Sequence, residues 1–184
     1  MRVIAGRFKG RTLAPPKRGG LRPTSDRLRE TLFNILAPRL DGARVLDAYA
    51  GTGAVGIEAL SRGAAHVVFV EENRQALTLI RQNLRRCGVT EGYTIVSRDA
   101  RELSGDGSLQ RFDIVFLDPP YDLPDVDRTL DVASVLVASG GLLVFEHATR
   151  REVPQAADRL VQRRQVRVGD SMLTFYEPVQ EERA

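Results

Sequence analysis

The sequence predicts an α/β fold: a doubly wound, mostly parallel sheet of seven strands with an antiparallel edge strand, preceded by a small β-hairpin. Three observations favour it. From residue 43 onward, short apolar runs alternate with amphipathic segments of helical period. A glycine-rich loop joins the first of these runs to the segment that follows it. Near the C-terminus, Gly169-Asp170 separates two strand-like runs and is a strong hairpin signal.

The N-terminal segment is unlike the rest of the chain. Residues 1–20 are predicted to form a basic β-hairpin and a linker, ahead of a domain of residues 21–184. Residues 1–29 carry nine basic residues and one acidic residue, a net charge of +8, whereas the remaining 18 basic and 23 acidic residues give −5. Such a basic end favours a polyanionic partner, and a solvated tail is the alternative.

The elements of the main domain follow in order. A helix is expected from about residue 25 to Leu36, with Pro38 just beyond its end. The other expected elements are strand 44–46, a helix to about residue 62, strand 66–70, helix 73–87, strand 93–96, strand 113–117, helix 124–138, strand 142–146, strand 161–168 and strand 171–177.

Composition excludes several classes of protein. No apolar run approaches the roughly 20 residues that span a bilayer. The single cysteine, Cys87, excludes an internal disulfide and a cysteine-based zinc site, and neither His66 nor His147 has companion ligands. We therefore expect a cytoplasmic protein without metal, and a monomer.

Acidic residues end four of the predicted strands. Asp47, Glu71, Asp99 and Asp118 each lie at or just beyond the carboxyl end of an apolar run. Ligands of open α/β sheets bind beyond these ends, so the four side chains are candidates for one site. A fold alone does not require an acid at each position.

Gly51-Thr52-Gly53-Ala54-Val55-Gly56 matches the G-x-G-x-x-G pattern of dinucleotide-binding loops. A NAD-dependent oxidoreductase and a turn without ligand are both compatible with it. However, Asp47 places a negative charge where a pyrophosphate would lie, and the loop is longer than a dinucleotide turn. These features suit S-adenosylmethionine (SAM), which has a zwitterionic tail, a ribose and an adenine. The residues predicted to bind it are Asp47, Tyr49, Gly51 and Gly53 in the loop, Glu71 at the ribose, and Asp99 and Ala100 at the adenine.

Asp118-Pro119-Pro120-Tyr121 directly follows an apolar strand. The prolines end the strand and stiffen the turn, so the Asp118 carboxylate and the Pro119 carbonyl are expected to be neighbouring acceptors. Two acceptors can hold an exocyclic amino group and aim its lone pair at an electrophile. Tyr121 could stack on an extruded base. A rigid loop with a packed tyrosine is the structural alternative.

These motifs resemble those of class I SAM-dependent amino-methyltransferases, which have a Rossmann-like fold. More closely, residues 2–13, 21–34 and 46–63, together with Asp118–Tyr121, resemble the bacterial 16S ribosomal RNA guanine-N2 methyltransferase family. The resemblance implies SAM as donor, a guanine amino group as acceptor, and 16S rRNA in a 30S subunit or assembly intermediate as partner. The catalytic residues would be Asp118, Pro119, Pro120 and Tyr121.

The segments before the glycine loop are expected to serve the substrate. The hairpin is small and basic, with Phe8 at its turn for one stacking contact on RNA. The residues expected to contact RNA are Arg2, Arg7, Phe8, Lys9, Arg11 and Arg22. The resemblance also implies that one segment closes over SAM or orients the target loop, and its candidate residues are Thr24, Asp26, Arg29 and Asn34. The alternatives for the last set are a helix cap and a solvated polar face.

Three other functions stay open on the sequence alone. An amino-methyltransferase could act on DNA adenine or on a protein amide. An oxidoreductase would leave Asp118–Tyr121 and the basic hairpin unexplained. A catalytically silent RNA-binding assembly factor would bind RNA without methyl transfer.

Overall fold

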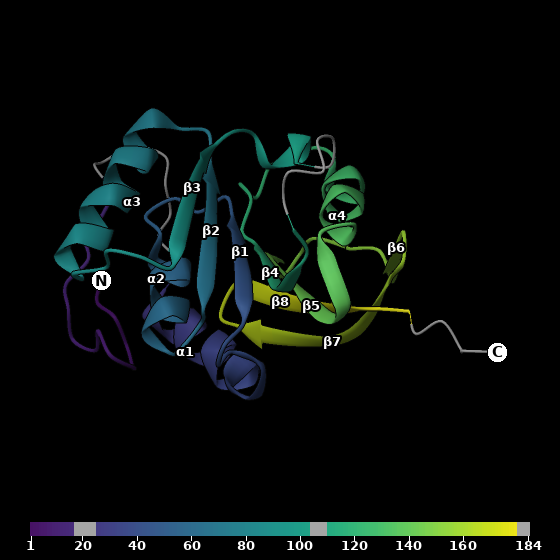
Figure 1. Ribbon diagram of the computed structural model, residues 1–184. Helices are drawn as coiled ribbons and strands as arrows, with labels where there is room; N and C mark the ends of the chain where they lie inside the picture. Colours follow the sequence, from purple (N-terminus) through teal and green to yellow (C-terminus); the bar gives the residue numbers. More distant parts are fainter. Residues whose placement is uncertain (17–24, 104–109, 180–184) are drawn as a thin grey trace.

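A single sheet organises the molecule (Figure 1). The computed structural model describes residues 1–16, 25–103 and 110–179. The strands are β1 (Arg44–Ala48), β2 (His66–Glu71), β3 (Tyr93–Ser97), β4 (Phe112–Leu117), β5 (Val137–Ala148), β6 (Ala156–Ala157), β7 (Leu160–Val168) and β8 (Ser171–Pro178). Their order is β3-β2-β1-β4-β5-β8-β7-β6. The first five are parallel, and β8 pairs antiparallel with both β5 and β7.

The helices are α1 (Asp26–Leu36), α2 (Ala54–Ser61), α3 (Arg74–Arg86) and α4 (Val126–Ser134), with 3-10 turns at Ala37–Arg39 and Ala100–Glu102. Apolar side chains of α1, α2 and α3 join one buried cluster with alternate residues of the sheet. Leu130 and Ala133 of α4 join a second cluster on the opposite face. The protein is therefore a three-layer α/β sandwich, and the predicted doubly wound sheet is confirmed.

Local signals set the helix starts as expected. Ser25 caps α1, with its side chain accepting from the Leu28 N–H at 3.2 Å. Asn73 caps α3 by accepting from the N–H groups of Gln75 and Ala76. Both helices then place an apolar stripe on the sheet.

The C-terminal part differs from the prediction in three details. Strand β5 begins at Val137 rather than residue 142, because a bulge lets Val137 pair with Phe112 while Leu142 pairs with Ile114. Helix α4 accordingly ends at Ser134. Over the described residues, the sheet has eight strands rather than seven, because the two-residue β6 pairs with the start of β7.

The N-terminal hairpin packs into the main core. Val3, Phe8 and Leu13 are buried in the cluster beneath α1 and α2. Its two arms are joined by the bridge between Arg2 and Thr12 and by backbone hydrogen bonds such as that from the Val3 N–H to the Arg11 carbonyl, at 3.0 Å. Other N–H groups of the hairpin are hydrogen-bonded to α2. The Glu58 carboxylate accepts from the N–H groups of Ile4 and Ala5, and Ser61 Oγ accepts from that of Phe8.

Arg29 is fully buried under the hairpin rather than lying on a solvated face. Its guanidinium donates to the Arg2 carbonyl at 2.9 Å and to Asp26 at 2.6 Å, and lies 3.6 Å from Glu58. Burying a charge of this kind requires such partners. Arg29 therefore joins the hairpin, α1 and α2.

Candidate functional site

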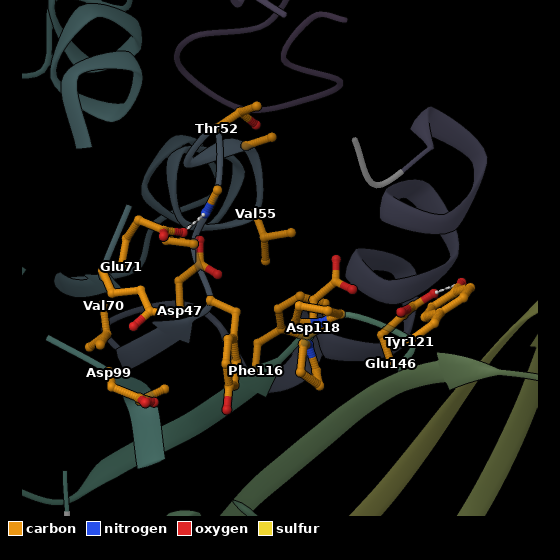
Figure 2. A pocket seen from close by; sticks show the side chains of 18 of the residues that line it. Asp47, Thr52, Val55, Val70, Glu71, Asp99, Phe116, Asp118, Tyr121 and Glu146 are labelled. Atoms are coloured by element: carbon orange, nitrogen blue, oxygen red, sulfur yellow. Dashed lines mark hydrogen bonds between the residues drawn. The ribbon is translucent and has the colours of Figure 1, made fainter. Parts of the chain in front are cut away.

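A cavity of about 390 Å³ opens at the carboxyl edge of the parallel strands (Figure 2). Ten of the eleven predicted catalytic and cofactor-binding residues line it, and they come from four segments of the chain. Those lining it are Asp47, Tyr49, Gly51, Glu71, Asp99, Ala100, Asp118, Pro119, Pro120 and Tyr121. The four carboxylates expected to meet at this edge therefore do so. Gly53 is the exception: it is buried at the start of α2 and does not line the cavity.

The glycine loop is shaped by close packing against β2. Gly53 has a φ of +74°, a conformation that favours glycine, and it directly precedes α2. A side chain on Gly56 would overlap the ring of Phe69. The glycines therefore bring the start of α2 down onto the sheet and shape the cavity wall.

Asp47 lies beneath this loop, with 2% of its surface exposed. Its Oδ2 accepts from the Gly56 N–H at 2.8 Å. Burial raises the pKa of Asp47 to about 7, and the nearby negative charge of Glu71 adds to the rise, while the Gly56 N–H opposes it. A cation bound beside Asp47 would favour its charged form.

Glu71 connects the loop to the end of β2. One carboxylate oxygen accepts from the Gly51 N–H at 2.9 Å, and the other accepts from the Asn73 N–H at 2.8 Å. Figure 2 shows the side chain beside the loop at the cavity wall. Because a carboxylate has about four acceptor positions, Glu71 retains capacity for two further donors.

Asp99 is held by a residue that the sequence did not single out. Arg101 donates to both Asp99 oxygens through its side chain, at 2.5 to 3.0 Å, and to one of them through its backbone N–H at 2.8 Å. These hydrogen bonds lower the pKa of Asp99. The carboxylate therefore stays charged and fixed at the cavity rim.

Tyr121 is tied to the C-terminal strands. Its hydroxyl donates to Glu146 Oε1 of β5 at 2.7 Å and lies 2.8 Å from Ser171 Oγ of β8. Arg151 donates to the carbonyls of Tyr121 and Leu123. The turn after β4 is therefore fixed at both the side chain and the backbone of Tyr121.

Glu146 is one of the lining residues that the sequence analysis missed, and it lies on the strand next to Asp118. It lies near the carboxyl end of β5, as Asp47, Glu71 and Asp118 lie at the ends of their own strands. The same rule that selected those residues would have selected it. The residues that line the cavity thus include seven acidic ones: Asp47, Glu71, Glu72, Asp99, Asp118, Asp122 and Glu146.

Several predicted substrate contacts lie elsewhere. Phe8 is only 7% exposed, with the Arg7 guanidinium 4.5 Å from its ring centre, so the expected stacking on RNA is wrong. Asp26, Arg29 and Asn34 do not line the cavity, and the first two bind each other. Two more predicted contacts, Arg22 and Thr24, lie outside the described residues.

Within the described ranges, no helix is long and apolar enough to cross a membrane. The same part of the chain has no group of three His, Cys, Asp or Glu side chains placed to hold a metal ion.

Comparisons with known proteins agree with the motifs. Residues 1–177 match the family described as Conserved hypothetical protein 95. The Bacillus subtilis protein named "Putative rRNA methyltransferase YlbH" is 35% identical, over 96% of this chain and 98% of its own. The Escherichia coli protein named "Ribosomal RNA small subunit methyltransferase D" is 39% identical, over 72% of this chain and 66% of its own.

A solved structure supports the same assignment. The Escherichia coli "Putative methyltransferase yhhF" superposes with a TM-score of 0.85 at 32% identity, and 97% of each chain is covered. The resemblance to bacterial 16S rRNA methyltransferases is thereby confirmed, and the chain belongs to the family described as Conserved hypothetical protein 95.

Proposed function

We propose that this methyltransferase transfers a methyl group from SAM to the exocyclic N2 amino group of a guanine in small-subunit ribosomal RNA, on the 30S subunit or an assembly intermediate. One observation carries the proposal: Asp118–Tyr121 lines the same cavity as Glu71 and Asp99. The residues proposed to hold the amino group and those proposed to bind the nucleoside therefore line one cavity. The names of the relatives support rRNA as the acceptor.

The cavity fits SAM in charge and size. Its volume of about 390 Å³ is in the range of small-molecule sites. Asp47 would face the ammonium of the amino-acid tail, and Glu71 has acceptor capacity for two ribose hydroxyls. Asp99, fixed by Arg101, would accept from the adenine amino group. When bound, SAM supplies an electrophilic methyl group on its sulfonium.

The acceptor base would leave its stack and enter beside Tyr121. The Asp118 carboxylate and the Pro119 carbonyl would each accept one N–H of the amino group, which aims the nitrogen lone pair at the methyl carbon. Attack would form the N–CH₃ bond as the S–CH₃ bond breaks, with S-adenosylhomocysteine as the leaving group, and the nitrogen would pass its extra proton to the Asp118 carboxylate or to water. Asp118 and Pro119 would thus act by orienting the amino group rather than by covalent catalysis.

One incubation tests the reaction, the donor and the acceptor together. Isotopically labelled SAM is mixed with the protein and unmodified small-subunit particles, with naked rRNA alongside, and the RNA is digested and analysed by mass. We expect label in N2-methylguanosine. Mass mapping of the nuclease fragments of the rRNA would then locate the methylated nucleotide. Label only in N6-methyladenosine or in protein would refute the proposal.

Asp118→Ala isolates the amino-group site. The variant removes one of the two proposed acceptors, so we expect turnover to fall at least about 100-fold while SAM affinity changes little. Asp131→Ala is the matched control, because Asp131 is exposed on α4 and does not line the cavity. Full turnover by Asp118→Ala would show that this residue does not hold the amino group.

The basic hairpin is proposed to bind RNA phosphates rather than bases. Arg7 and Lys9 are exposed at its turn, whereas Arg11 donates to the Cys87 carbonyl at the end of α3. If Arg7 and Lys9 each neutralise one phosphate, replacing both by alanine lowers the slope of log affinity against log salt by about 1.4 to 1.8.

A second double variant distinguishes a specific phosphate contact of the hairpin from a general effect of net charge on RNA binding. Arg163→Ala with Arg164→Ala removes the same charge from the exposed part of β7. We expect this pair to leave the salt slope nearly unchanged. If both double variants lowered the salt slope equally, the hairpin would make no specific contribution to RNA binding.

A further inference from the structure

A carboxylate that the proposed reaction does not use lies beside Asp118. Leu117 of β4 pairs with Phe145 of β5 in parallel register, so the next residues, Asp118 and Glu146, are neighbours at the same edge of the sheet. Adjacent strands lie about 4.8 Å apart. Figure 2 places both side chains at the wall of the cavity.

The two oxygens of Glu146 differ in their surroundings. The residue is 3% exposed, and Oε1 accepts from the Tyr121 hydroxyl at 2.7 Å. Oε2 is buried, and no hydrogen-bond donor reaches it from the described part of the chain. A buried carboxylate oxygen without a donor is unfavourable, and a ligand that brings an N–H to it would remove that cost.

We infer that Glu146 reads the Watson–Crick edge of the acceptor base and selects guanine, an inference that rests on the proposed function. Guanine carries an N1–H donor next to its C2 amino group. A guanine whose amino group is held by Asp118 therefore presents a second donor on the side of the neighbouring strand. Oε2 of Glu146 is the acceptor available there.

The same arrangement disfavours adenine. Adenine has an unprotonated N1 beside its amino group, so its N1 lone pair would face the Glu146 oxygen. Two acceptors facing each other repel and leave both without a donor. A site built around a buried hydrogen-bond partner rejects an analogue that lacks the matching group far more strongly than a purely apolar site does. Glu146 is thus a specificity-determining residue, distinct from the acceptors of the amino group.

The test uses 2-aminopurine, which keeps the C2 amino group but has no N1–H. The target guanosine, once located, is replaced by 2-aminopurine riboside in ligated rRNA, and kcat/KM is measured for both substrates. We expect the wild-type protein to prefer guanine about 100-fold or more. Glu146→Gln retains an oxygen for the Tyr121 hydroxyl and places an NH₂ where Oε2 lies. We expect it to reduce the preference at least about tenfold.

Three further variants distinguish base selection by Glu146 from its hydrogen bond to Tyr121. Tyr121→Phe and Ser171→Ala remove hydrogen bonds that hold the tyrosine but leave the Glu146 carboxylate in place. We expect them to lower turnover of both bases by similar factors and to preserve the preference. Glu146→Asp withdraws the carboxylate and should reduce the preference, as Glu146→Gln does. SAM affinity and the melting temperature report whether each variant folds.

The outcomes are distinct. If Glu146→Gln lowers turnover of both bases equally, Glu146 acts only by positioning Tyr121 and the inference is overturned. An unchanged preference in folded Glu146→Gln and Glu146→Asp also overturns it. If instead the wild-type protein methylates no guanine at N2, the proposed function fails before the question of base selection arises.

Discussion

Asp47 gives the clearest prediction that needs no substrate. It is buried beneath the glycine loop, and its pKa is raised from 3.8 to about 7. The perturbation is Asp47→Asn, which keeps an oxygen to accept from the Gly56 N–H and removes the ability to ionise. We expect this variant to be more stable than the wild-type protein at pH 8 and similar to it near pH 4.

The sign and size follow from proton linkage. Below about pH 4, Asp47 is protonated in both the folded and the unfolded chain. Between about pH 4 and 7 it is protonated only when folded, so the stability that it contributes is lost as the pH rises through this window. A shift of about three pKa units corresponds to about 4 kcal/mol in the free energy of unfolding, at about 1.4 kcal/mol per pH unit.

The assay is urea unfolding of both proteins, followed by circular dichroism, at several pH values from 4.5 to 8. Other titrating groups affect both proteins, so the difference in unfolding free energy isolates Asp47. We expect this difference to grow across the window and to level off above pH 7. Parallel stability curves for the two proteins would refute the reasoning and would show that Asp47 does not titrate near neutral pH.

Two more predictions follow from named contacts. If the ammonium of SAM lies beside Asp47, SAM binding ionises the carboxyl, so SAM affinity should fall by up to about tenfold per pH unit below pH 7. Calorimetry in two buffers of different ionisation enthalpy would detect the proton released on binding. Asp47→Asn should remove this pH dependence. Gly6→Ala should release the N-terminal hairpin, because Gly6 has a φ of +79° and its new methyl group would overlap the Ser61 carbonyl. We expect a loss of about 1–3 kcal/mol and rapid proteolysis before residue 16. Gly10→Ala, with a φ of +83° but open space around it, is the control and should cost less.

Sequence reasoning succeeded where local pattern determines the result. Alternation of apolar runs and helices was sufficient for the sheet, and parallel strands necessarily bring their carboxyl ends to one edge. Asp47, Glu71, Asp99 and Asp118 therefore met as expected. Glu146 required no new principle, since it occupies the equivalent position of the next strand.

The failures involve contacts between residues far apart in the chain. Phe8 looks like an exposed hairpin tip from its neighbours, but its N–H donates to Ser61, 53 residues later, and its ring is buried. Arg29 looks like a surface residue of an amphipathic helix, but it is buried because Arg2, Asp26 and Glu58 supply its partners. Local sequence patterns contain no information about such distant partners, so the sequence could not predict these contacts.

The position of the hairpin constrains the acceptor. The backbone N–H groups of Arg7 and Phe8 donate to Ser61, the last residue of α2, whereas Ala54, the first, lines the cavity. Eight helical residues separate the two surfaces by about 12 Å. A free nucleoside in the cavity could not reach the basic turn, but a folded RNA of several nucleotides could reach both. The hairpin should therefore affect methylation of rRNA and leave the binding of SAM unchanged. If the Arg7→Ala and Lys9→Ala pair weakened SAM binding as well, the two surfaces would be coupled through the fold, and the assignment of separate roles would be wrong.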